Sequence, residues 1–340
     1  MKTVSIALFL AILSTAGLAQ KGPGYHIVRK TLVGGGGGWD YSYVDASARR
    51  LYVSHSTKVV VLDADEVSVI GEIPNTEGVH GIAVAPEFNQ GFTSNGRTST
   101  VTIFDLKTLN TIKEVPVTGK NPDAILYDAF SKHLFTFNGR SADASVLDAS
   151  SGDTLATIPL GGKPEFAVTD LNGHIYVNIE DKSEIATIET KTNTVLTRWS
   201  IAPGEEPSGL AFDAEHRRLF SVCDNKLMTV SDPDKGSVVT TVPIGNGPDA
   251  CKFDPETQLV FSSNGEGTVT VIHEDSPDKY SVVETVTTQR GARTISLDAR
   301  THALFLTTAE FGETPKPTAE HPRPRPRMIP NTFVVLQLQK

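Results

Sequence analysis

The chain has 340 residues and a formal net charge of −9 at pH 7. An acidic balance argues against nucleic acid or an anionic membrane as the partner, because phosphate binding usually needs a basic face. The two cysteines, Cys223 and Cys251, are too few for a disulfide framework. The sequence leaves open whether these two thiols pair or stay free.

The first predicted element is a secretory signal peptide over residues 1–19. Lys2 is a short basic start, residues 4–13 form an apolar run, and Gly17, Leu18 and Ala19 form a small-residue cleavage site. The apolar run is too short to span a bilayer, so we expect no membrane span. The expected location is periplasmic or secreted, with residues 20–340 as the mature chain.

After this segment the chain repeats itself. Apolar runs end at seven anchor residues, which lie 40 to 44 residues apart: Asp45, Ala85, Asp128, Asp170, Asp213, Asp254 and Asp298. Within one repeat, 122–161, four short runs rich in Val, Ile, Leu, Thr and Phe are separated by polar turns, which is the pattern of strands. Seven repeats of four antiparallel strands predict an all-β fold, a single seven-bladed β-propeller.

The two ends of the chain predict how the ring closes. Residues 26–34 (HIVRKTLVG) match the fourth strand of later repeats, such as 111–119 (TIKEVPVTG). The last repeat ends on a third strand, 333–337 (FVVLQ), and has no fourth. We therefore expect the N-terminal strand to complete the last blade.

Several stretches resemble the YVTN family of β-propeller repeat proteins, which includes the exported bacterial YncE-like proteins. The resemblance is carried by LYVSHSTKVVVLD (51–63), GIAVAP (81–86), ATIPLGGKPE (156–165) and FSSNGEGTVTVI (261–272). It extends over all seven repeats and implies the propeller fold. It implies little about activity, although relatives suggest binding or scaffold roles in the cell envelope.

One position varies within the repeated phrase Gly-x-x-Pro. The residue after the Pro position enters the innermost strand at the rim of the central channel, and we call these seven residues the charged ring: Asp40, His80, Asp123, Glu165, Ser208, Asp249 and Arg293. Four carboxylates that converge on one axis should have raised pKa values unless a cation or Arg293 compensates. The ring is a candidate ligand site.

The ring also offers metal chemistry. Asp123, Glu165 and Asp249 supply hard oxygen ligands that suit Ca²⁺ or Mg²⁺. His80 is a candidate base beside such an ion. The spacing of these residues matches no fixed metal motif, so the ion, the cofactor and any catalysis stay open.

A second candidate ring lies ten residues past the anchors, in the loop that follows the second strand. It contains His55, Asn95, Asn138 and Asn264. Asn-Gly at three of these positions is also ordinary turn chemistry, so a structural role and a ligand role both remain open.

An insertion interrupts the last repeat. Residues 311–331, which we call the arm, are rich in Pro and Arg and favour polyproline II rather than a strand. The arm should emerge on the same face as the charged ring, where Arg323 and Arg325 could contact a ligand or partner. A solvated insertion without a role is the alternative.

Three functions remain after these steps. The first is an exported module that binds a protein or a small molecule through the channel mouth and the arm. The second is a hydrolase dependent on a divalent metal, resembling propeller lactonases. The third, a subunit of a periplasmic redox complex, has no cofactor motif to support it.

Overall fold

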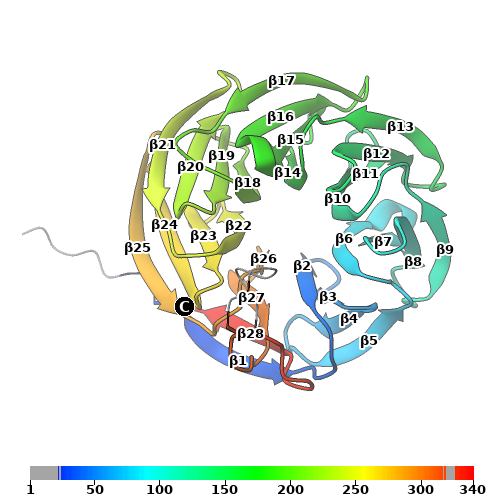
Figure 1. Cartoon of the computed structure of the whole chain (residues 1–340), viewed down its shortest axis with the longest axis horizontal. Helices are drawn as coiled ribbons and strands as arrows, with labels where there is room; N and C mark the ends of the chain where they lie inside the picture. The colour runs from blue at the N-terminus through cyan, green and yellow to red at the C-terminus, as the bar shows by residue number, and fades with distance from the viewer. Residues whose placement is uncertain (1–21, 23, 317, 319–325) are drawn as a thin grey trace, which may run out of the picture.

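The computed structural model describes residues 22, 24–316, 318 and 326–340, and within them the chain forms seven four-stranded antiparallel sheets around a ring (Figure 1). The predicted fold is therefore confirmed. The predicted signal peptide (1–19) lies outside the described residues, as do Arg323 and Arg325 of the arm. No helix in the described part of the chain is long and apolar enough to cross a membrane.

In each of the first six blades the chain runs from the innermost strand to the outermost. Blade one contains β2 (Trp39–Asp45), β3 (Arg50–His55), β4 (Lys58–Asp63) and β5 (Val69–Pro74). Blade two contains β6 (Val79–Ala85), β7 (Gln90–Asn95), β8 (Thr100–Asp105) and β9 (Thr111–Pro116), and blade three contains β10 (Pro122–Asp128), β11 (His133–Asn138), β12 (Asp143–Asp148) and β13 (Thr154–Pro159). Single 3₁₀ turns, η1 (Pro86–Phe88) and η2 (Glu180–Lys182), lie in blades two and four.

Blades four to six follow the same order. Blade four contains β14 (Pro164–Thr169), β15 (His174–Ile179), β16 (Glu184–Glu189) and β17 (Thr194–Ser200). Blade five contains β18 (Pro207–Asp213), β19 (Arg218–Cys223), β20 (Leu227–Asp232) and β21 (Ser237–Pro243). Blade six contains β22 (Pro248–Asp254), β23 (Leu259–Asn264), β24 (Thr268–Ser276) and β25 (Lys279–Thr287).

The seventh blade joins the two ends of the chain. Its inner three strands are β26 (Ile295–Asp298), β27 (Ala303–Thr308) and β28 (Val334–Gln339), and its outer strand is β1 (His26–Leu32). β1 pairs antiparallel with β28, from His26 opposite Gln339 to Leu32 opposite Val334. The predicted closure is confirmed, and the arm leaves the blade between β27 and β28.

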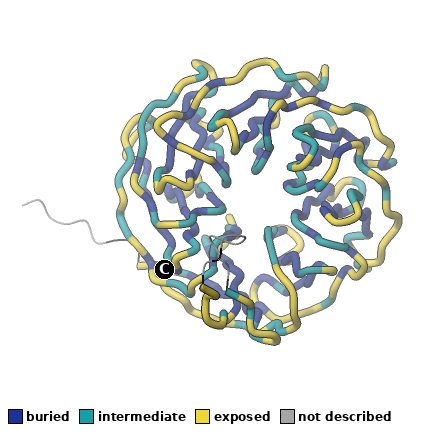
Figure 2. The backbone as a smooth tube through the Cα atoms, in the orientation of Figure 1, coloured by how far each residue is buried: buried dark blue, intermediate teal, exposed yellow. Residues whose placement is uncertain are grey.

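The core lies between neighbouring blades. The third strands carry four consecutive buried residues, as in Val59 to Leu62 of β4, because both faces of such a strand pack against another sheet. Exposed residues are concentrated in the outer strands and turns (Figure 2). Cys223 and Cys251 are both buried and free.

The Asp that closes many strands has a local function. Asp45 accepts hydrogen bonds from the backbone N–H groups of Ser47 (3.1 Å) and Ala48 (2.9 Å), and Asp63 does the same for Asp65 and Glu66. An Asp side chain that bonds to the backbone two and three residues later fixes a tight turn. This turn chemistry explains why the repeats end in Asp.

Candidate functional site

The charged ring lies at the end of the channel where the inner strands begin, which we call the channel mouth. In the first six blades the strand register shifts at the ring residue: in blade one, for example, Trp39 pairs with His55 but Ser42 pairs with Val53. The extra residue is a β-bulge, and a bulge redirects a side chain out of the regular alternation. The seventh blade differs, because β26 begins only at Ile295.

The backbone of the ring is held by second-strand side chains that sequence reasoning missed. Ser94 in blade two donates to the carbonyl of Asp123 in blade three, and Ser263 in blade six donates to the carbonyl of Arg293 in blade seven. Asn178 in blade four donates to the carbonyl of Ser208 at 3.0 Å. These contacts satisfy backbone carbonyls at the mouth and link three of the ring residues to the preceding blade.

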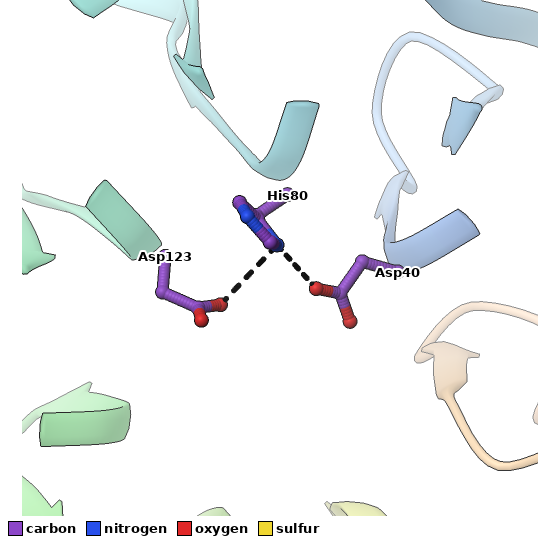
Figure 3. Close-up of side chains that lie close together, drawn as sticks. All are labelled: Asp40, His80 and Asp123. Atoms are coloured by element: carbon purple, nitrogen blue, oxygen red, sulfur yellow. Dashed lines mark hydrogen bonds and ion pairs between the residues drawn. The ribbon is translucent and has the colours of Figure 1, made fainter. Parts of the chain in front are cut away.

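His80 lies between two carboxylates of the ring (Figure 3). Its Nδ1 is 2.6 Å from Oδ2 of Asp40 and 3.7 Å from Oδ1 of Asp123. Burial disfavours the protonated imidazole and by itself would lower the pKa of His80. The hydrogen bond with Asp40 and the negative charge of Asp123 outweigh burial and raise this pKa to about 9. At neutral pH this imidazole is protonated, so the arrangement favours His80 as a donor rather than as the expected base.

Asp123 lies on the other side of His80 from Asp40. Burial and the charge of Asp40 raise the pKa of Asp123 to about 6, against the opposing effects of His80, Lys163 and a hydrogen bond from Tyr41. Tyr41, one residue past the ring position in β2, was not singled out from the sequence. Burial and the surrounding carboxylates raise its pKa well above the ordinary value, so its hydroxyl stays protonated.

Glu165 is paired with a cation from its own turn. Lys163 Nζ is 2.6 Å from Glu165 Oε1 and also contacts Glu180. Burial and the charge of Asp123 nevertheless raise the pKa of Glu165 to about 8. Lys163, two residues before the ring position, is a further member of the site that the sequence analysis missed.

The remaining ring members lie in blades five to seven. Arg293 donates to Asp249 at 2.8 Å and to the carbonyl of Trp39 at 3.3 Å. Burial still raises the pKa of Asp249 to about 7, although Arg293 opposes the shift. The Ser208 hydroxyl donates to the carbonyl of Pro248 at 3.2 Å. The expected rise in carboxyl pKa is thus confirmed for Asp123, Glu165 and Asp249.

The structure groups the possible metal ligands differently from the sequence analysis. Asp123, Glu165 and Asp249 were expected to share an ion, but Glu165 pairs with Lys163 and Asp249 pairs with Arg293. Among the described residues the mouth instead brings together Asp40, His80 and Asp123, whose ligand atoms all lie within 4.8 Å of one another. By distance alone, the donor set therefore contains one imidazole nitrogen and two carboxylates.

The second candidate ring lies inside the blades. Asn95, Asn138 and Asn264 have no exposed surface. Asn95 accepts from Thr93 (2.9 Å) and donates to Thr100 and Thr102 (3.1 and 2.8 Å), and the other two repeat this pattern within their own blades. Their hydrogen bonds are used locally, so the geometry favours the structural role over the ligand role.

His55 is buried for a different reason. Its ring stacks on Phe333 with centroids 4.3 Å apart, and neither ring nitrogen has a hydrogen-bond partner among the described residues. Burial, and to a lesser extent Lys58, lowers the pKa of His55, so its ring stays neutral. This packing buries His55 against Phe333 rather than on the mouth surface.

The first and last described residues of the arm contact one side of the mouth. Phe311 pairs with Met328 in an isolated antiparallel bridge, and its ring packs against Trp39 with centroids 6.0 Å apart. A cavity of about 430 Å³ lies here, with Trp39, Asp249, Arg293, Phe311 and Pro326 among its lining residues. The cavity connects aromatic surface with part of the charged ring.

Comparison with known proteins adds no family or relative to this picture. No protein-family model matches the chain, and no curated protein matches it at a significant level.

Proposed function

We propose that this chain is an exported β-propeller of YVTN type, periplasmic or secreted, which binds a ligand or a partner protein at its channel mouth. Export is supported by the signal-peptide pattern of residues 1–19, and the YVTN relationship by the repeated phrases quoted above. A propeller is often a binding or scaffold module, and the chemistry of this mouth narrows what it would bind.

The observation that carries the proposal is the convergence of Asp40, Asp123 and Asp249 at a mouth that opens beside an aromatic cavity, and their proximity contributes to the raised carboxyl pKa values. Asp123, Glu165 and Asp249 have pKa values of about 6, 8 and 7, so the mouth retains protons near neutral pH that a bound cation would displace. The cavity beside Asp249 adds the faces of Trp39 and Phe311, which attract an ammonium group. The ligand group is therefore an ammonium, on a small molecule or on a lysine of a partner.

Titration calorimetry with putrescine tests this proposal. The affinity should rise between about pH 6 and pH 8 as the ring carboxyls ionise, and binding should release protons. Asp123→Asn should weaken binding about tenfold, because it removes one charged acceptor. Asp65→Asn, which changes an exposed carboxylate far from the mouth in sequence and fold, is the matched control. Putrescine binding that is absent, or equal in wild type and Asp123→Asn, contradicts the proposal.

A second candidate, a metal-dependent hydrolase resembling propeller lactonases, is favoured by the grouping of Asp40, His80 and Asp123. One imidazole and two carboxylates suit Zn²⁺ or Mn²⁺ better than the Ca²⁺ or Mg²⁺ expected from the sequence. Such an ion would have to displace the proton from His80. When bound, it would polarise a lactone carbonyl and activate water.

Metal content and thermal melts with and without EDTA decide between the candidates. A hydrolase should purify with near-stoichiometric metal, melt at a lower temperature in EDTA, and lose lactone hydrolysis in His80→Gln. Protein without metal, with an unchanged melt and no lactone hydrolysis after Zn²⁺ or Mn²⁺ is added, rules out this candidate and leaves the binding proposal standing.

A further inference from the structure

A second cavity occupies the channel on the far side of the charged ring. Its volume is about 440 Å³, and its walls come from residues further along six of the seven inner strands, from Tyr43 of β2 to Lys252 of β22. No member of the charged ring lines it. We call this cavity the inner chamber.

Three side chains separate the inner chamber from the mouth. Tyr41 of blade one packs against Phe166 of blade four with ring centroids 5.5 Å apart. Lys252 of blade six places its Nζ 4.7 Å from the centroid of the same Phe166 ring. Because these blades are not neighbours, the contacts cross the channel and divide it into two compartments.

The walls of the inner chamber are mainly apolar, and their polar groups are the Lys252 amine and the hydroxyls of Ser42, Thr169 and three tyrosines. Ile82, Leu126, Val168 and Phe212 are representative of the lining, and Lys252 is the only charged residue in it. A chamber of roughly 300–1,000 Å³ with mainly apolar walls and a few polar groups is the usual form of a small-molecule site. This volume lies at the lower end of that range.

The Lys252 amine has no counter-charge. It makes no hydrogen bond or ion pair with any described residue, and its one specific contact is the face of Phe166. Burial lowers the pKa of Lys252, which is the expected response of an ammonium group to apolar walls. Lys252 is half-buried in the channel, where an ammonium group without a partner is poorly stabilised and a bound anion would pair with it.

We propose that the inner chamber binds a small apolar carboxylate, with its carboxylate against Lys252 and its hydrocarbon or aromatic part against the chamber walls. Phe166 holds the amine on the chamber side of the channel through the cation–π contact. The chamber ligand is an anion, whereas the ligand proposed for the mouth is a cation. The two compartments therefore bind different molecules, and neither site depends on the other.

The test uses two probes of nearly equal shape, 2-naphthoate and the neutral 2-naphthamide, with inorganic phosphate as a third. Titration calorimetry should show one naphthoate per chain, with naphthamide at least about tenfold weaker, because the amide lacks the charge that pairs with Lys252. Equal binding of the two aromatic probes, or no naphthoate binding, overturns the proposal. Phosphate binding without naphthoate binding also overturns it, in favour of an inorganic-anion subsite.

Three variants locate the binding. Lys252→Met keeps most of the side-chain volume and should weaken naphthoate at least about tenfold without lowering the melting temperature, since it removes an unpaired, half-buried charge. Leu126→Trp fills the chamber and should abolish binding. Lys107→Met, at an exposed position, should change neither property. If both chamber variants bind naphthoate as wild type does, the probe lies elsewhere and the proposal is wrong.

Discussion

At the scale of single residues, the position of the His80 imidazole in the mouth depends on how closely Gly96 packs against it. A β-carbon at Gly96 would lie 2.5 Å from His80 Nε2 and 2.7 Å from its Cδ2, so only glycine fits there without moving the imidazole. The equivalent glycine of the next blade, Gly139, has no atom closer than 3.6 Å to the same position. The Asn-Gly pair of blade two thus has a steric role beside His80 that the pair of blade three lacks.

Gly96→Ala should displace His80 from Asp40. The hydrogen bond with Asp40 and the charge of Asp123 hold the pKa of His80 at about 9, so displacement should move it toward its ordinary value of 6.5. The measurement is an NMR titration of the imidazole resonances, with His80→Gln used for assignment. Gly139→Ala is the matched control and should leave the titration unchanged. An unaltered His80 titration in Gly96→Ala would contradict this prediction, because it would show that the imidazole keeps its position beside the added methyl group.

At the scale of strands and turns, the Asp that ends an inner strand also contacts the next blade. Asp298 of blade seven pairs with Arg49 of blade one at 2.8 Å and has no exposed side-chain surface. Arg49 also pairs with Asp65 at 2.5 Å, but the Asp65 side chain is 56% exposed. The Arg49 guanidinium therefore makes one buried and one exposed ion pair, which can be compared directly. Both lie where blade seven meets blade one.

Asp298→Asn should lower the free energy of unfolding by about 3 kcal/mol, because it leaves part of a buried ion pair without its partner. Asp65→Asn should change stability little, because water screens an exposed pair. Urea unfolding of both variants against wild type measures the difference. Similar losses from the two substitutions would mean that burial does not decide the strength of the Arg49 contacts.

At the scale of the whole molecule, the ring gathers titratable groups from separate blades into one mouth. The pKa values of Asp123, Glu165 and Asp249 are raised above their ordinary values, so the folded chain binds more protons than the unfolded chain between about pH 4 and pH 8. Stability should therefore fall as pH rises through this window. His80 acts in the same direction: its contribution is complete below pH 6.5 and is lost as pH rises through about 9.

The corresponding prediction is a free energy of unfolding that declines from about pH 5 to pH 9. Glu165→Gln should flatten this decline, because glutamine carries no charge at any pH, and the variant should be more stable than wild type above about pH 8. Glu114→Gln, on the exposed face of β9, is the control. Urea unfolding across the pH series gives the result, and a flat or rising wild-type profile would contradict the raised carboxyl pKa values.

Much of the fold could be read from the repeat. The strands, the Asp-capped turns and the N-terminal closure of blade seven all follow from local patterns that recur seven times. The members of the charged ring were also identifiable, because a position that varies inside a repeated phrase stands out. Lys163 and Tyr41 were missed because they lie two residues before and one residue after that position, where the sequence gives no sign that they reach the mouth.

The sequence by itself determined which residues stand at the start of each innermost strand, since the repeat length fixes their position in every blade. Only the tertiary structure decided which of them meet. Contacts such as His80 with Asp40 and Asp123, or Lys252 with Phe166, join residues from different blades. Their partners depend on bulges and on the curvature of the closed ring, because these fix distances and burial across the channel.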